Sequence, residues 1–109
     1  MLEISIAKSF SLTPGPRYRE EGPFSGEQFR EEVLLPAFDK AVSEREKLTI
    51  NLDGTAGYGT SFLEEVFGGL ARIREEASVI QTLEIISTEE PYLLNDIAGY
   101  IREANKLPE

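Results

Sequence analysis

Apolar and polar residues alternate in three stretches of the chain, and each alternation predicts a half-buried β-strand. The first stretch places Leu2, Ile4 and Ile6 on one face, and the second, residues 48–52, has the same pattern. The third covers residues 82–87. Proline and glycine interrupt the chain on both sides of residues 17–21, where we expect a further, short strand with its tyrosine, Tyr18, facing inward.

Three other stretches repeat their apolar residues every three to four positions, which predicts amphipathic helices. The first begins at Ser25, which has the spacing of a capping box with Gln28. Pro36 predicts a kink or an end within this helix. The second helix begins at Ser61, which forms a similar pair with Glu64, and the third closes the chain.

A pair of glycines, Gly68 and Gly69, lies in the middle of the second predicted helix. Each glycine costs a helix interior about 1 kcal/mol relative to alanine. Such a pair is best explained by something that packs close to the helix backbone. We expect that contact to come from inside the fold.

In chain order the predicted elements are strand, short strand, helix, strand, helix, strand and helix. Helices that alternate with strands indicate an α/β fold, here a small sheet of about four strands flanked by three helices. At 109 residues the chain is long enough for one hydrophobic core and too short for two. We therefore expect a single domain over residues 1–109.

Composition limits the classes of function. The sequence has no cysteine, no apolar run of about 18 residues and no signal-peptide layout, so we expect a cytoplasmic protein without a membrane segment. It also lacks histidine, the usual general base near neutral pH and the commonest metal ligand. We therefore expect no catalytic residue, no metal and no cofactor. The net charge of −9 would repel phosphate backbones, which argues against a nucleic acid partner.

The glycine-rich turn Gly54–Ser61 lies between the second long strand and the second helix, and we expect a site there. Its spacing matches a Walker A loop, but Thr60 stands where that motif needs a lysine for the phosphates. A dinucleotide fingerprint would need a glycine in place of Phe62, and a serine hydrolase would need a histidine. Backbone amides at a helix start still attract anions, so binding of a small anion or nucleotide by this turn is the alternative function.

Thr60 and Ser61 carry hydroxyls at the expected start of the second helix. A phosphate on either residue would meet the positive end of the helix dipole and would add about −1.5 to −2 charges to the surface. Ser61 could equally be only a helix cap, which contributes about 1 kcal/mol. The residues alone leave both interpretations open.

The strand, the hydroxyl-bearing turn and the helix together resemble the phosphorylation segment of STAS domains, which occur in anti-sigma factor antagonists and sulfate transporter tails. More closely, the chain resembles a bacterial family of STAS-like domains of unknown function. The resemblance rests on residues 13–17, 22–30 and above all 53–70, DGTAGYGTSFLEEVFGGL. It implies a mixed sheet flanked by helices.

This resemblance also implies a non-enzymatic regulatory or protein-interaction module. In the antagonists, a kinase of the Bergerat ATPase type phosphorylates a Ser or Thr at the start of the helix and so blocks partner binding. By position the candidate here is Ser61, with Thr60 as second choice. Gly59 and Phe62 stand where that motif usually has Asp and Gly. The implied partner is another protein, such as an ATPase, a kinase or a regulator; the oligomeric state is left open.

We expect the partner to dock on the strand–turn–helix segment. Tyr58 would be an exposed aromatic anchor, although an aromatic side chain at a turn can equally fold back on the core. The two acidic residues after the turn would face water and form a charged rim. The predicted docking residues are Gly57, Tyr58, Gly59, Phe62, Glu64 and Glu65.

Overall fold

The computed structural model describes residues 2–106, and its sheet contains three strands. They lie in the order β1 (Leu2–Ser5), β2 (Leu48–Asn51) and β3 (Leu83–Ile86), and both neighbouring pairs are parallel. The predicted α/β class is confirmed. The prediction of about four strands in a mixed sheet is wrong, because the short fourth strand does not form and the sheet is purely parallel.

The segment expected to form that strand is a loop that ends in a short 3₁₀ helix, Arg19–Glu21. Tyr18 is 43% exposed rather than facing inward. The backbone amide of Arg19 donates to the side chain of Glu27 at 2.9 Å, and its guanidinium pairs with Glu31 and Glu32. Arg19 therefore bonds to side chains of the following helical run instead of to a neighbouring strand.

The connection from β1 to β2 is helical. It begins with α1 (Ile6–Ser9), whose first residue the alternating pattern assigned to the first strand. After the loop, α2 (Gly26–Phe29), a π-helical segment (Arg30–Leu34) and α3 (Leu35–Glu44) follow one another directly. Pro36 does not end this run; it lies where the π-helical segment passes into α3, and π-helical turns often occur where the regular helical bonding is interrupted.

The start of α2 matches the predicted capping box in part. Ser25 is fully buried, and its hydroxyl accepts a hydrogen bond from the Gln28 amide at 3.0 Å. The Gln28 side chain bonds to the amide of Phe24, the residue before the cap, at 3.1 Å. This helix therefore begins where the sequence predicts.

The connection from β2 to β3 contains the second predicted helix and one that the pattern did not predict. α4 (Thr60–Leu63), a second π-helical segment (Glu64–Gly68) and α5 (Gly69–Ile73) follow one another directly. The unexpected helix, α6 (Glu76–Thr82), leads straight into β3. α7 (Leu93–Glu103) is the third predicted helix. Within residues 2–106, no helix combines the length and the apolar character that crossing a bilayer requires.

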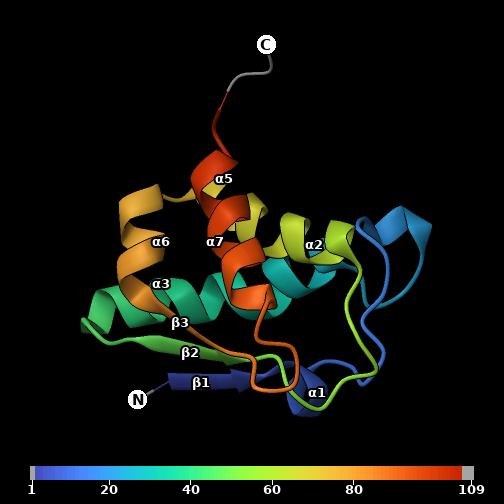
Figure 1. Ribbon diagram of the computed structural model, residues 1–109. Coiled ribbons are helices and arrows are strands. Elements are labelled where there is room, and N and C mark those ends of the chain that lie inside the picture. The colour runs from blue at the N-terminus through green and yellow to red at the C-terminus, as the bar shows by residue number, and fades with distance from the viewer. Residues whose placement is uncertain (1, 107–109) are drawn as a thin grey trace.

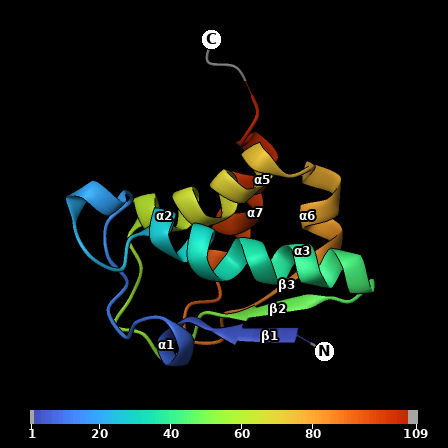
Figure 2. The same cartoon turned by 180° about the vertical axis from the view of Figure 1, so that it is seen from behind.

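Helices α2 to α7 all lie over one face of the sheet (Figures 1 and 2). Right-handed crossovers between strands that are neighbours in chain order place their helices on the same side, so the order β1-β2-β3 accounts for the position of α2 to α6. The core fills the space between the sheet and the helices. Its largest fully buried side chains include Phe29, Phe38, Leu48, Ile50, Phe62, Phe67 and Leu70.

The opposite face of the sheet is polar. The strand register places Glu3, Thr49 and Glu84 in one row on this face, and the next such row is also mainly polar. Glu3 and Glu84 are exposed on the two outer strands, while Thr49 between them is buried. We call this surface the open face.

Candidate functional site

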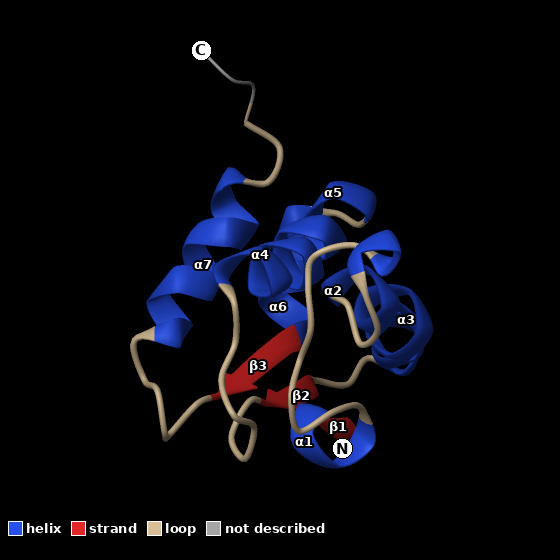
Figure 3. Cartoon of the chain, turned by 90° about the vertical axis from the view of Figure 1, so that its right-hand side faces the viewer, coloured by secondary structure: helices blue, strands red, loops and turns tan. Residues whose placement is uncertain are grey.

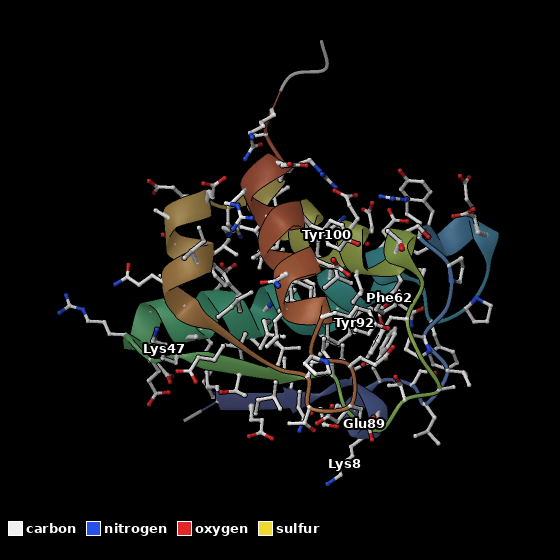
Figure 4. The ribbon with its side chains drawn as sticks, in the orientation of Figure 1. Lys8, Lys47, Phe62, Glu89, Tyr92 and Tyr100 are labelled. Carbon is white, nitrogen blue, oxygen red and sulfur yellow. The ribbon has the colours of Figure 1, made fainter. Side chains whose placement is uncertain are left out.

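The glycine-rich turn lies at the carboxyl end of the sheet. Figure 4 shows Phe62 and Glu89 at this end, with Lys47 at the opposite end of the strands. Gly54 and Gly57 have φ angles of 96° and 138°, which glycine adopts without a steric penalty and other residues rarely adopt. The glycines therefore shape the backbone of the turn.

Asp53 joins this turn to the loop that follows β3. Its carboxylate accepts hydrogen bonds from the Thr88 hydroxyl at 2.5 Å and from the Glu89 amide at 3.0 Å. In return, the Glu89 carboxylate accepts a bond from the Gly54 amide at 2.8 Å. The bond from the Glu89 amide, followed by that from Thr88, lowers the pKa of Asp53, so this carboxylate is ionised at neutral pH. The two loops hold each other through this pair of acidic side chains.

Tyr58 folds back on the core instead of projecting as an anchor. Its hydroxyl donates to the backbone oxygen of Leu52 at 2.6 Å, and its ring centroid lies 5.9 Å from that of Phe62. Burial raises the pKa of Tyr58 to about 12, so the hydroxyl remains a donor throughout the physiological range. Of the two placements that the sequence left open, the structure has the second, and Tyr58 fastens the turn to the end of β2.

Thr60 and Ser61 are exposed in the first turn of α4. The N-cap residue is Gly59, not Ser61, and no side chain caps this helix. The predicted capping box is therefore absent. Neither hydroxyl forms a hydrogen bond with any residue that the structure describes, so both are accessible at the positive end of the helix dipole.

Glu64 and Glu65 belong to an internal network of charges. Arg17 donates to Glu64 at 2.5 Å and to Glu65 at 3.3 Å, Arg72 donates to Glu64 at 2.7 Å, and Arg30 donates to Glu65 at 2.6 Å. The hydrogen bond from Arg72, more than that from Arg17, lowers the pKa of Glu64. Glu65 is only 7% exposed, so the prediction that both acids face water is wrong for this residue. A buried carboxylate needs such partners, and the sequence pattern did not reveal them.

Gly68 and Gly69 have no side chains, and this leaves room for the charged side chains of the network beside the helix backbone. A β-carbon at position 69 would lie 2.5 Å from a terminal nitrogen of Arg30, and one at position 68 would collide with the carboxylate of Glu64. The expected close approach to the helix backbone is thus made by charged side chains of the same chain. Arg30 donates a further bond to the backbone oxygen of Glu65 at 3.2 Å.

The structure divides the predicted docking residues by their exposure. Gly59 is exposed, Phe62 is fully buried and Glu65 nearly so. The other three are partly exposed: Gly57, Tyr58 and Glu64. Because Phe62 and Glu65 are buried, they cannot contact a partner in this conformation, and the residue pattern does not show what covers them.

One surface residue beside the turn was missed. Leu12 is 64% exposed, and its backbone oxygen accepts a hydrogen bond from the Ala56 amide at 2.8 Å. It lies in the irregular loop after α1, and periodicity says nothing about such a segment. The accessible surface therefore combines the turn with the neighbouring loop.

Comparison with known proteins gives one family. The model of a family described as a STAS-like domain of unknown function matches residues 25–93. The matched range begins at the cap of α2, includes the turn and its helix, and ends at the start of α7. No significant match is found among curated proteins or among solved structures.

Replacing Tyr58 by Phe removes the hydroxyl that bonds to the Leu52 carbonyl. We expect the free energy of unfolding to fall by about 1 kcal/mol, the usual net contribution of such a bond. Urea denaturation measures the change. Tyr92→Phe is the matched control, because Tyr92 is 61% exposed and its hydroxyl bonds to the side chain of Glu90 rather than to a backbone oxygen. Equal losses in both variants would contradict the fastening role of Tyr58.

Replacing Gly69 by Ala pushes the Arg30 guanidinium away from Glu65. Breaking a buried ion pair costs about 3–5 kcal/mol and alanine returns about 1 kcal/mol of helix propensity, so we expect a net loss of about 2–4 kcal/mol. Gly99→Ala in α7 is the control, since a β-carbon there meets nothing within 4 Å. It should stabilise the protein by up to about 1 kcal/mol. Thermal and urea unfolding measure the stability of both variants. If both variants are more stable than the original protein, this account of Gly69 is wrong.

Proposed function

The chain belongs to the STAS-like domain family of unknown function, and we propose that it is a non-enzymatic regulatory module that binds another protein through the turn Gly57–Ser61. Gly59, Thr60 and Ser61 are exposed, and two sets of bonds hold the backbone of the glycine-rich turn in one shape. Tyr58 fastens it to β2, and Asp53 with Glu89 fasten it to the neighbouring loop. A docking surface that is already ordered loses little conformational entropy when a partner binds.

The observation that carries this proposal is the pair of exposed hydroxyls of Thr60 and Ser61, which make no bond within the described residues. They lie at the amino end of a helical run that extends to Ile73, and its N-cap, Gly59, has no side chain to compete with a phosphate. A phosphate there would find free backbone amides and a favourable dipole. It would also change the charge of the docking surface at its centre.

We propose Ser61 as the modified residue and Thr60 as the second choice. The partner would be a protein such as a Bergerat-type ATPase or kinase, as the resemblance to anti-sigma factor antagonists implies. Leu12 would add an apolar contact beside the turn. Gly57 and Gly59 would allow the partner to approach the backbone closely.

Replacing Ser61 by Asp imitates the charge of a phosphate in part. We expect at least about tenfold weaker binding to the partner, because an uncompensated charge in an interface costs several kcal/mol. The fold should not be weakened, since an acidic residue in the first turn of a helix contributes about 0.3–1 kcal/mol of stabilisation. Isothermal titration against an ATPase or regulator encoded beside this chain's gene measures the affinity, and thermal unfolding measures the stability.

Ser43→Asp is the control for this variant, because Ser43 is also exposed but lies before β2, at the other end of the strand. It adds the same charge away from the turn and should leave the affinity unchanged. Unaltered binding by the Ser61 variant would remove the hydroxyl switch. Equal weakening by both variants would point to net charge alone.

The alternative function is binding of a small anion or nucleotide by the turn Gly54–Ser61. Free amides in the first turn of α4 favour it. Three features oppose it: the Gly54 amide is already bonded to Glu89, the Ala56 amide is bonded to Leu12, and the strand order has no reversal point at which open α/β sheets bind nucleotides.

Titration with ATP, GTP and inorganic phosphate tests this alternative. We expect no binding tighter than the millimolar range, because Asp53 and Glu89 place two acidic side chains beside the turn. Isothermal titration calorimetry in a low-salt buffer is the measurement. Micromolar binding of any of the three ligands would favour the alternative over the docking module, provided that the variant Gly59→Pro, with Glu89 unchanged, loses that binding.

A further inference from the structure

A groove of about 220 Å³ lies on a different part of the molecule from the turn, between α6 and α7 and over β3. Its walls are largely apolar and include Ile80 of α6, Ile85 of β3, and Leu94 and Ala98 of α7. Ile80 is 56% exposed and Leu94 is 42% exposed. Figure 3 shows α6 and α7 standing over β3, on the side of the sheet away from β1.

The floor of this groove is an edge strand. β3 pairs with β2 on one side only, and no element of the described residues pairs with its other side. Its outer backbone donors and acceptors are therefore available to a further strand. An extended segment that bonded there would place every second side chain in the groove and the remaining side chains on the open face.

The charge on the open face indicates which segment would fit. Glu84 is the first of the two β3 residues on that face; it is exposed and has no ion-pair partner among residues 2–106. A lysine or arginine directly opposite it in an added strand would be favourable, and an acidic residue would be unfavourable. The net charge of −9 acts in the same direction.

We propose that the outer edge of β3 and this groove bind an extended segment of another protein in which apolar residues alternate with lysine or arginine. The apolar side chains fill the groove between Ile80 and Leu94, and a basic side chain pairs with Glu84. A second copy of this chain is a poorer occupant, because two molecules that each carry nine negative charges repel one another.

Two synthetic peptides test the proposal by fluorescence anisotropy at about 0.15 M salt, where long-range attraction is screened. The first has the sequence Gly-Ser-Val-Lys-Val-Lys-Val-Ser-Gly, and the second replaces both lysines by glutamate. We expect the lysine peptide to bind more tightly by about 2- to 10-fold, from the usual contribution of one cross-strand charge pair and its reversal. Amide chemical shifts of the bound protein should change most along β3.

A charge reversal separates the pairing from general attraction. Glu84→Lys should invert the preference, so that the glutamate peptide becomes the tighter ligand. Glu3→Lys is the matched control, because Glu3 lies in the same row of the open face on the opposite edge strand and changes the net charge equally. It should leave the preference for the lysine peptide in place. Ala98→Phe narrows the groove and should weaken both peptides by at least about tenfold.

Three results would overturn the proposal. The first is that neither peptide binds at millimolar concentration, and the second is that the Glu3 variant inverts the preference as fully as the Glu84 variant does. The third is a dimer of the free protein, detected by light scattering, that Ala98→Phe dissociates; the occupant of the edge is then a second copy.

Discussion

The buried carboxylate of Glu65 is the constraint on which much of the helical layer depends. Arg30 approaches it from the helical run after β1, and Arg17 approaches it from the loop before that run. A buried ion pair adds little net stability over a well-packed apolar pair, but leaving one of its charges unpartnered is costly. Glu65 therefore fixes where the loop and two helical runs can lie, and Gly69 leaves the space that the Arg30 guanidinium occupies against the helix backbone. Gly68 leaves the corresponding space for the neighbouring carboxylate of Glu64.

The sequence predicts the local part of this structure well. Alternation locates the three strands, and helical periodicity locates the runs that begin at Ser25 and near Ser61. It fails where distant residues decide the outcome. Residues 17–21 look like a strand, but the Arg19 guanidinium bonds to carboxylates twelve and thirteen positions later. α6 is too short to show a clear helical period of apolar residues. The sheet is purely parallel because the predicted fourth strand does not form.

The candidate site divides in the same way. The turn, its glycines and its accessible hydroxyls follow from residue type and position between a strand and a helix. The burial of Phe62 and Glu65 does not, because an aromatic or acidic residue type does not tell whether it meets solvent or a partner within the fold. The hydrogen bond between Asp53 and Glu89 joins residues 36 positions apart, and only the parallel pairing of β2 with β3 brings these residues together.

The layering of helices on one face has a consequence for how the chain folds. Each strand adds beside the one made before it, so the sheet can assemble in the order in which a ribosome releases the chain. Both pairings nevertheless join residues far apart in sequence, such as Leu2 with Leu48. Each pairing can form only after the helices between its two strands have been synthesised. Such non-local pairing slows folding relative to a helical bundle of similar length. β3 is the last strand to be synthesised and completes the sheet late. Until then β2 is an unpaired edge strand of the sheet.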